Sequence, residues 1–308
     1  MKLSRSDIPF GIIHFMAYPA TIRGGGPVVE TLKTVAEDDY FRLIELTHIE
    51  SDQQRKEAVS ILRNAGKRYA YGAQPCLLIN KANLNDPDKD ARNTAVTIVK
   101  NAVDEATEIE AEALAFLSGK DPGQEKRAEA KKLLADSVLQ ICSYAGSRNP
   151  ELNIILETFD RAIFGKNALL GPTCESVEFA QSIRNDFQDF GLMIDLSHLP
   201  ILGEASRDAL TAAKDVLSHI HVGNCVIRHP EHPAYGDEHP QFGIEEGENG
   251  VEELTEFMKI LTEIEYLNAD SCGAVSFEVK PMPGQDSSDV IQNAKDTMNL
   301  AMDKLRIK

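Results

Sequence analysis

Short apolar runs alternate with longer amphipathic segments along the whole chain. Runs of this length are typical of buried parallel strands, and we predict strands at 9–17, 41–47, 69–78, 113–118, 153–159, 191–197, 217–223 and 274–280. The other segments have helical spacing, which predicts helices at 28–37, 51–64, 88–109, 124–144, 174–189, 204–215, 251–266 and 287–304. Each predicted strand is therefore followed by a predicted helix.

This regular alternation predicts the fold class. Eight strand-then-helix units in 308 residues have the size and order of a single α/β domain, a (β/α)8 barrel over residues 1–308. No linker rich in Gly, Pro or Ser interrupts the alternation. The one long irregular stretch, 224–250, holds three histidines, and loops of that length in a compact domain are usually functional or disordered. We expect it to cover an active site as a lid.

The charge balance narrows the choice of partners. Asp and Glu number 49 against 32 Lys and Arg, which gives a formal net charge of −17. Such a surface repels nucleic acid and anionic membranes, and no stretch of about 20 apolar residues is present to cross a bilayer. The five cysteines are far apart and form no CxxC pair, which favours reduced thiols. We expect a cytoplasmic protein with a small-molecule partner, and homo-oligomer formation stays open.

Polar side chains lie near the ends of the last four predicted strands. Glu157 and Asp195 each follow a run of apolar residues, His221 stands near the end of the seventh strand, and Glu278 near the end of the eighth. Because active sites of such barrels form where the strands end, we expect these four side chains to converge.

Three carboxylates and an imidazole in one barrel interior favour a metal site. Taken singly, each carboxylate fits a helix cap and the histidine fits a hydrogen-bonded core residue. Together, the buried carboxylates are costly unless a cation compensates them or they retain their protons. Such a mixed set of oxygen and nitrogen ligands suits one divalent ion, Mn²⁺, Mg²⁺ or Co²⁺, and zinc stays an alternative.

The four motifs that carry these residues resemble a known family. LETFDR, DLSH, HIHVGN and FEVKP, in this order, resemble the xylose isomerase-like TIM barrels, which include sugar-phosphate isomerases and ketose 3-epimerases. The resemblance runs from the first strand to the last. It implies an octahedral divalent ion held by Glu157, Asp195, His221 and Glu278.

The resemblance also implies residues that contact the substrate. In the ketose 3-epimerase branch the histidine three positions after the aspartate contacts the sugar, and here it is His198. An arginine after the metal histidine does the same, and Arg228 is the nearest match, one residue later than the pattern. A second carboxylate of that branch is replaced by Ile163. The identity of the substrate therefore does not carry over.

The ligand set predicts a mechanism. Isomerisation or epimerisation next to a carbonyl needs proton-handling groups and a counter-charge for the enediolate, which a divalent ion supplies. Glu157 and Glu278 come from well-separated strands and are the predicted pair of bases. We expect a metal-dependent isomerase or epimerase of a sugar, sugar phosphate or related polyol ketone. A lyase of the inosose dehydratase type and a non-catalytic, metal-bound sugar-binding barrel stay open.

Several basic residues are candidates for substrate contact. Lys280 shares a face with Glu278 and either neutralises a developing oxyanion, binds a phosphate or forms a structural ion pair. Arg161, directly after the LETFD motif, and Lys166 either receive a phosphate or carboxylate or stay solvated. His239, within the predicted lid, is a further substrate-binding candidate.

Other polar residues have weaker patterns. Glu45, His48 and His14 either line the pocket or make core hydrogen bonds. The run of three glycines at 24–26 lacks the Lys-Ser/Thr of a phosphate-binding loop and predicts a flexible turn. A second ion is an alternative within the lid, whose candidate ligands mainly predict a shaped loop: His229, His232, Asp237 and His239.

Overall fold

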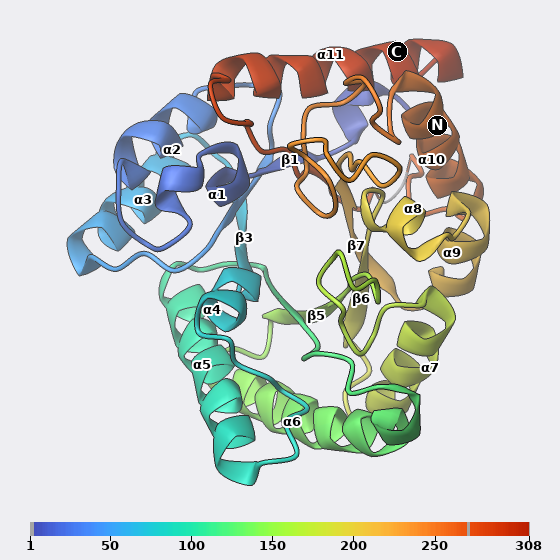
Figure 1. Ribbon diagram of the computed structural model, residues 1–308. Coiled ribbons are helices and arrows are strands. Elements are labelled where there is room, and N and C mark those ends of the chain that lie inside the picture. Colours follow the sequence, from blue (N-terminus) through green and yellow to red (C-terminus); the bar gives the residue numbers. More distant parts are fainter. Residues whose placement is uncertain (1–2, 270–271, 308) are drawn as a thin grey trace.

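The computed structural model describes residues 3–269 and 272–307. Eight parallel strands follow one another around a closed barrel, and β8 pairs with β1 (Figure 1). The strands are β1 (Phe10–Ile13), β2 (Leu43–Leu46), β3 (Arg68–Gly72), β4 (Ala113–Leu117), β5 (Asn153–Thr158), β6 (Gly191–Asp195), β7 (Leu217–Val222) and β8 (Val275–Phe277). The predicted (β/α)8 barrel is confirmed.

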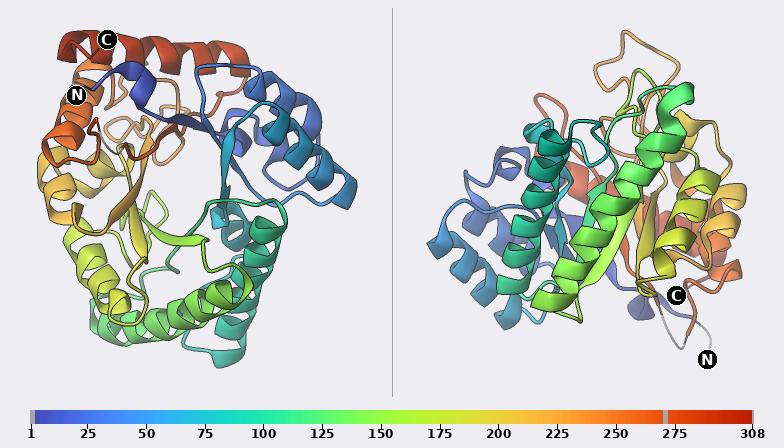
Figure 2. Two further views of the ribbon diagram at one scale, coloured as in Figure 1. Left: turned by 180° about the vertical axis from the view of Figure 1, so that it is seen from behind. Right: turned by 90° about the horizontal axis from the view of Figure 1, so that it is seen from below.

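The helices form a ring outside the barrel (Figures 1 and 2). The long ones match the predicted segments: α2 (Val28–Ala36), α3 (Asp52–Asn64), α5 (Lys89–Glu108), α6 (Arg127–Arg148), α7 (Thr173–Arg184), α9 (Ser206–Ala213), α10 (Val251–Glu263) and α11 (Ser287–Leu305). One short helix precedes β1, and the others lie in the connections: η1 (Arg5–Asp7), then α1 (His14–Ala17), η2 (Pro19–Thr21), α4 (Gln74–Ile79), η3 (Gln124–Lys126) and α8 (His198–Leu202).

Three predicted strands are much shorter than their apolar runs. The run 274–280 contains only β8, which ends at Phe277, so Glu278 and Lys280 follow the strand and do not belong to it. The run 9–17 leaves the sheet after Ile13 and turns into α1, and the run 69–78 leaves it after Gly72 and turns into α4. Proline at the first turn of α4, Pro75, suits a helix start because its fixed backbone angle is helical and its missing N–H is not needed there. Apolar composition alone does not separate a buried strand from a short buried helix.

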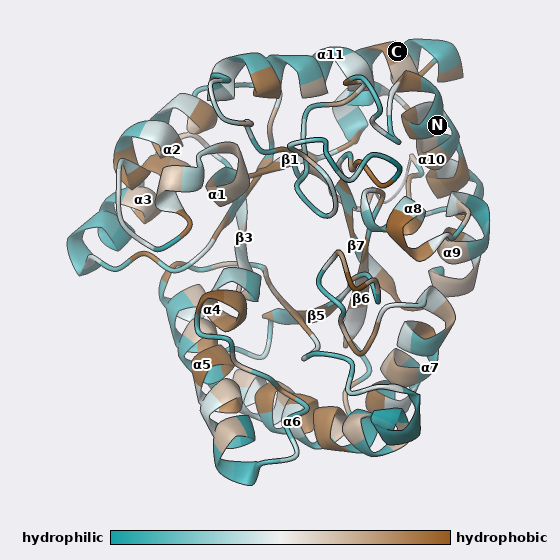
Figure 3. Cartoon of the chain, viewed as in Figure 1, coloured by the Kyte–Doolittle hydropathy of each residue, from teal (hydrophilic) through white to brown (hydrophobic). Residues whose placement is uncertain are grey.

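The core has two parts. The larger part lies between the barrel and its helices, whose apolar faces turn inward while their polar faces form the outer surface (Figure 3). The smaller part fills the barrel interior: Leu43, Ala70, Ala113, Ala115, Ile155, Met193 and Ala274. Because strand side chains alternate with a period of two, the residues two positions after these also point into the interior, nearer the carboxyl ends of the strands.

Two long segments project from one end of the barrel. They connect β5 to α7 and β7 to α10, and the chain termini lie toward the opposite end (Figure 2). In the described part of the chain, no helix has the length and apolar composition needed to cross a membrane.

Candidate active site

The period of two brings acidic side chains to the top of the barrel interior. Ile155 is followed two positions later by Glu157, and Met193 by Asp195. Both carboxylates are almost fully buried. The interior is therefore apolar at one end and acidic at the end where the strands finish, as active sites of this fold require.

Three of the four predicted ligands lie together. Ligand atoms of Glu157, His221 and Glu278 are within 4.8 Å of one another. His221 Nδ1 lies 2.8 Å from Glu278 Oε2 and 3.8 Å from Glu157 Oε1. The predicted convergence of the fifth, seventh and eighth strands is thus present.

Asp195, the fourth predicted ligand, belongs to an adjoining group with His198 and His239. Its Oδ2 atom lies 3.6 Å from His239 Nδ1 and 3.9 Å from His198 Nε2. His239 Nε2 lies 3.5 Å from Glu278 Oε1, which joins the two groups. His198 and His239, both predicted to contact substrate, therefore lie at the centre of the buried site.

Glu45 supports the metal-ligand candidate from behind. Its carboxylate lies 3.2 Å from His221 Nε2 and 2.7 Å from His219 Nε2. In the structure His221 Nδ1 donates to Glu278 Oε2 at 2.8 Å. With an ion bound, a proton kept on Nε2 and donated to Glu45 would leave the Nδ1 lone pair for the metal, the arrangement common for histidines that bind metals. Glu45 thus does both things that its pattern allowed, because it lines the cavity and makes buried hydrogen bonds to two histidines.

Two residues that the sequence did not single out orient the acidic side chains. Gln74 in α4 donates from Nε2 to Glu157 Oε2 at 2.8 Å. Ser197 donates its backbone N–H to Asp195 Oδ1 at 2.9 Å, and its hydroxyl bonds Oδ2. The Asp-x-Ser spacing is a known turn signal, whereas Gln74 lies in a run that predicted a strand and gave no signal.

The carboxylates control the protonation of the buried histidines. Burial alone would lower the pKa of His198, but Asp237, Glu157 and Asp195 outweigh it and raise this pKa to about 10. Burial likewise opposes protonation of His239, yet Glu278 and Asp237 raise its pKa to about 9. The site thus draws positive charge, in the form of protons when no metal is bound.

The β5–α7 segment is folded around one buried carboxylate. Asp160 accepts backbone N–H groups from Ala162 and Lys166, each at 2.9 Å. A side chain at position 165 would collide with Asp160, so glycine is required there. This turn carries Lys166 to the cavity, where its Nζ lies 2.7 Å from Asp237 Oδ2.

The β7–α10 segment supplies the opposite wall. Asp237 Oδ1 lies 2.8 Å from His239 Nε2, and Asp237, Glu238 and His239 all line the cavity. Gly223, which follows β7, lets the segment approach closely, since a Cβ there would lie 3.1 Å from His239 Nδ1. The residues 224–250 therefore reach the site, as the prediction of a lid requires.

The structure does not bring every predicted residue to the cavity. Arg161 forms an ion pair with Glu175, with nitrogen–oxygen distances of 2.8 and 2.9 Å. Arg228 is largely exposed, pairs with Glu248 and lines a different surface pocket. The short-range patterns that suggested Arg161 and Arg228 contain no information about these distant acidic partners.

Two histidines of the alternative second ion site also lie elsewhere. His229 pairs with Glu246 at 3.0 Å, and His232 Nδ1 accepts the backbone N–H of Ala234. The other two candidates, Asp237 and His239, instead adjoin the main site, and a group formed by Asp160, His198 and Asp237 lies beside it. The proposed lid histidines are therefore divided between the surface and the interior.

The site opens into a cavity of about 190 Å³. Glu157, His221 and Glu278 line its acidic side, and Lys280 at its edge bonds Glu238. The other side is apolar and comes from β1, α1, the loop that follows α1, α4 and the end of β5: Ile13, Phe15, Met16, Ile22, Pro75, Leu78, Ile79 and Phe159. The cavity thus combines an acidic metal-binding end with an apolar wall.

The donor set fits a divalent cation. Glu157 Oε1 is buried without a hydrogen-bond partner among the described residues. Unpaired buried polar atoms are costly, and a cation is the partner that carboxylate and imidazole donors share. Glu157, Asp195, His221 and Glu278 are the residues that would hold it.

Comparison with models of known protein families shows which family this chain belongs to. The model of the xylose isomerase-like TIM barrel matches residues 35–302 of the chain. The chain is a member of the xylose isomerase-like TIM barrel family. The resemblance of its strand-end motifs to this family is confirmed. No curated protein sequence matches this family member.

Solved structures share the fold of this xylose isomerase-like barrel at low sequence identity. D-Psicose 3-epimerase with D-tagatose from Clostridium cellulolyticum H10 is 17% identical, with a TM-score of 0.68, over 97% of this chain and 98% of that one. An L-ribulose 3-epimerase is 15% identical, with a TM-score of 0.72, over 97% and 96%. The IOLI protein with a bound zinc atom is 14% identical, with a TM-score of 0.71, over 96% and 99%.

Proposed function

We propose that this chain is a divalent-metal-dependent isomerase or epimerase of a sugar, sugar phosphate or related polyol ketone. The observation that carries the proposal is the pair of glutamates, Glu157 and Glu278, that line one cavity on either side of His221 Nδ1. The similar folds of two ketose 3-epimerases and of a zinc-binding protein support it. The ion is Mn²⁺, Mg²⁺ or Co²⁺, with zinc as the alternative that the last of these structures supports.

A divalent ion held there would polarise the substrate carbonyl and offset the charge of the enediolate. Glu157 and Glu278 are the proton-handling groups. Gln74 fixes Oε2 of Glu157 and leaves Oε1 without a hydrogen bond among the described residues, so Oε1 is the atom that would face both the ion and the substrate. Glu278 Oε1 faces His239 Nε2 at 3.5 Å.

The surrounding residues bind the substrate and exclude water. His239, which lines the cavity, donates hydrogen bonds to sugar hydroxyls, and Lys280 faces the cavity when it releases Glu238. His198, the other predicted histidine contact, is buried and does not line the cavity, so its role is to position the acidic side chains around it. The segment 224–250 is our proposed lid, because its residues Asp237 to His239 already line the cavity. Exclusion of water would strengthen each electrostatic contact inside.

A solvent-exchange experiment tests the proposal. Protein stripped of metal and reloaded with Mn²⁺ is incubated in D2O with ketoses, ketose phosphates and inososes, and deuterium beside the carbonyl is measured by NMR. We expect metal-dependent incorporation with at least one of them. A product that is lighter than the substrate by one water molecule would identify a lyase instead. Absence of exchange with every compound at full Mn²⁺ occupancy would refute the proposed chemistry.

Two variants assign the bases. Glu157→Gln and Glu278→Gln should each abolish product formation, because an amide does not accept a carbon-bound proton. In one substrate direction, the variant that keeps the abstracting base should still incorporate deuterium. Metal content is measured first, so that loss of the ion is not mistaken for loss of the base. Near-normal product formation by both metal-loaded variants would place the bases elsewhere.

A further inference from the structure

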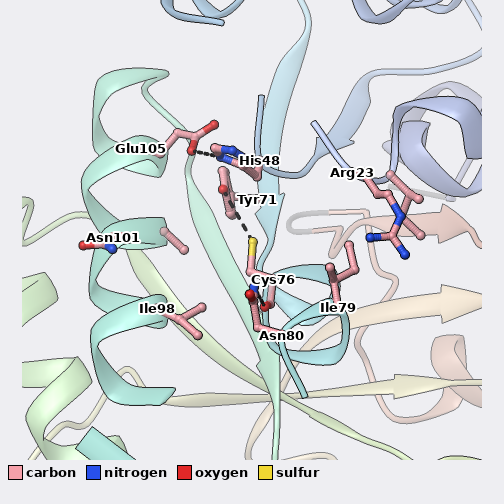
Figure 4. A pocket seen from close by; sticks show the side chains of 11 residues that line it. Arg23, His48, Tyr71, Cys76, Ile79, Asn80, Ile98, Asn101 and Glu105 are labelled. Carbon is pink, nitrogen blue, oxygen red and sulfur yellow. Dashed lines mark hydrogen bonds and ion pairs between the residues drawn. The ribbon is translucent and has the colours of Figure 1, made fainter. Parts of the chain in front are cut away.

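A second cavity adjoins the candidate active site. It has a volume of about 320 Å³ and lies beside the first cavity, because Ile22 and Ile79 line both (Figure 4). Its other walls come from the ends of β2 and β3 and from α4 and α5. Ile22 and Ile79 are therefore the side chains that separate the two cavities, and a substrate held at the acidic end of the first cavity reaches the second one if these two side chains move apart.

The polar groups of this outer cavity are mostly committed to one another. His48 Nδ1 lies 2.8 Å from Glu105 Oε2, and Glu105 Oε1 accepts the backbone N–H of Ile49 at 2.8 Å. The Tyr71 hydroxyl faces the Cys76 thiol (Figure 4). Burial raises the pKa of Cys76, so this thiol is a protonated wall residue and not a nucleophile.

Arg23 is the exception. It faces the outer cavity from the side opposite α5 (Figure 4). The two lysines of the neighbouring cavity are paired, Lys166 with Asp237 and Lys280 with Glu238. Among the described residues, Arg23 alone of the arginines and lysines that line the two cavities has no acidic partner.

An unpaired guanidinium in a strongly acidic protein indicates the charge of its ligand. Guanidinium groups bind the oxygens of phosphates and carboxylates through parallel hydrogen bonds. We propose that Arg23 binds an oxyanion, a phosphate or a carboxylate, at the far end of the substrate. This inference rests on the proposed function, and it narrows the substrate to a sugar derivative that bears an anionic group remote from its carbonyl.

Binding of three probes to Mn²⁺-loaded protein tests the inference. They are D-fructose, D-fructose 6-phosphate and D-fructuronate, and the measurement is isothermal titration calorimetry. At least one charged probe should bind ten-fold or more tightly than D-fructose, and the tighter of the two identifies the anionic group. No measurable binding of either charged probe, or affinity no higher than that of D-fructose, would overturn the inference.

Variants locate the contact. Arg23→Gln should lower the affinity for the preferred charged probe at least ten-fold and leave that for D-fructose unchanged, and Arg23→Lys should give an intermediate loss. Arg23 is exposed, so folding should be unaffected. Arg42→Gln, an exposed arginine just before β2 at the other end of the barrel, is the matched control. A phosphate bound to the ion itself would be insensitive to Arg23→Gln, and this result would contradict the assignment.

The exchange experiment separates this inference from the proposed function. Deuterium incorporation without any effect of Arg23→Gln on charged probes would sustain the function and refute the outer site. Binding that depends on Arg23, without exchange of any compound at full metal occupancy, would refute the function and sustain the oxyanion site.

Discussion

The two halves of the barrel end in different chemistry. The strands β5 to β8 lead to Glu157, Asp195, His221 and Glu278, whereas β1, β2 and β4 end in Ile13, Leu46 and Leu117. The first half contributes most of the apolar wall of the cavity, through β1, α1, the loop that follows α1, and α4. The second half therefore carries the candidate metal ligands, and the first half shapes the space beside them.

The histidines of the two halves show the same contrast. In the first half, burial lowers the pKa of His14 to about 4. In the second half, burial has the same tendency, but the neighbouring carboxylates raise the pKa of His221 well above its usual range. His14 and His221 are equally buried, yet their pKa values shift in opposite directions, because carboxylates surround only His221.

Removal of a second-half ligand should have the largest effect. Asp195→Asn or His221→Ala should release the ion and with it the metal-dependent turnover, because the remaining carboxylates then lack their common partner. Elemental analysis and the exchange assay measure these changes. Asp215→Asn, an exposed carboxylate before β7, is the control. Full metal occupancy in both ligand variants would contradict the site.

Glu45 is the first-half residue that belongs to the second-half site. Glu45→Gln should weaken the affinity for Mn²⁺ by roughly 10–100-fold, since second-shell partners of a metal histidine typically contribute this much. A competition titration with a fluorescent chelator measures the affinity. An unchanged affinity would show that the contact with His221 Nε2 does not orient this ligand.

His14, in the first half, should make the free energy of unfolding depend on pH. Its folded pKa of about 4 lies below the unfolded value of 6.5, so the stability it contributes is present above pH 6.5 and is lost as the pH falls toward 4. Between pH 7 and 5 the free energy of unfolding should fall by about 2 kcal/mol more than in His14→Gln. Urea unfolding of both proteins at both pH values measures this, and equal slopes would refute it.

The apolar wall should affect the substrate and not the ion. Leu78→Ser, on α4, should raise KM about five-fold, a loss of ~1 kcal/mol, with kcat and Mn²⁺ affinity unchanged. Leu300→Ser on α11, which is similarly exposed, is the matched control. A loss of metal affinity in Leu78→Ser would show that the two halves do not divide the work in this way.

The sequence predicted the barrel and the four strand-end residues because both follow from short-range periodicity. Alternation of apolar runs and helices identified the eight units, and the period of two placed Glu157 and Asp195 inside. Contacts between residues that are far apart in the sequence leave no periodic pattern in it, so they could not be predicted. The pairing of Arg161 with Glu175 and the bond from Gln74 to Glu157 depend on how the loops fold back.

Crystals of the Mn²⁺-loaded protein would test the metal site most directly, by anomalous scattering at the manganese edge. We predict a peak bound by Glu157, Asp195, His221 and Glu278, which requires Asp195 and the three other ligands to close on one ion. A peak held instead by Glu45, His219 and His221, or by Asp160, His198 and Asp237 alone, would contradict this account. The absence of any anomalous peak in the barrel, in crystals grown with saturating Mn²⁺, would also contradict it.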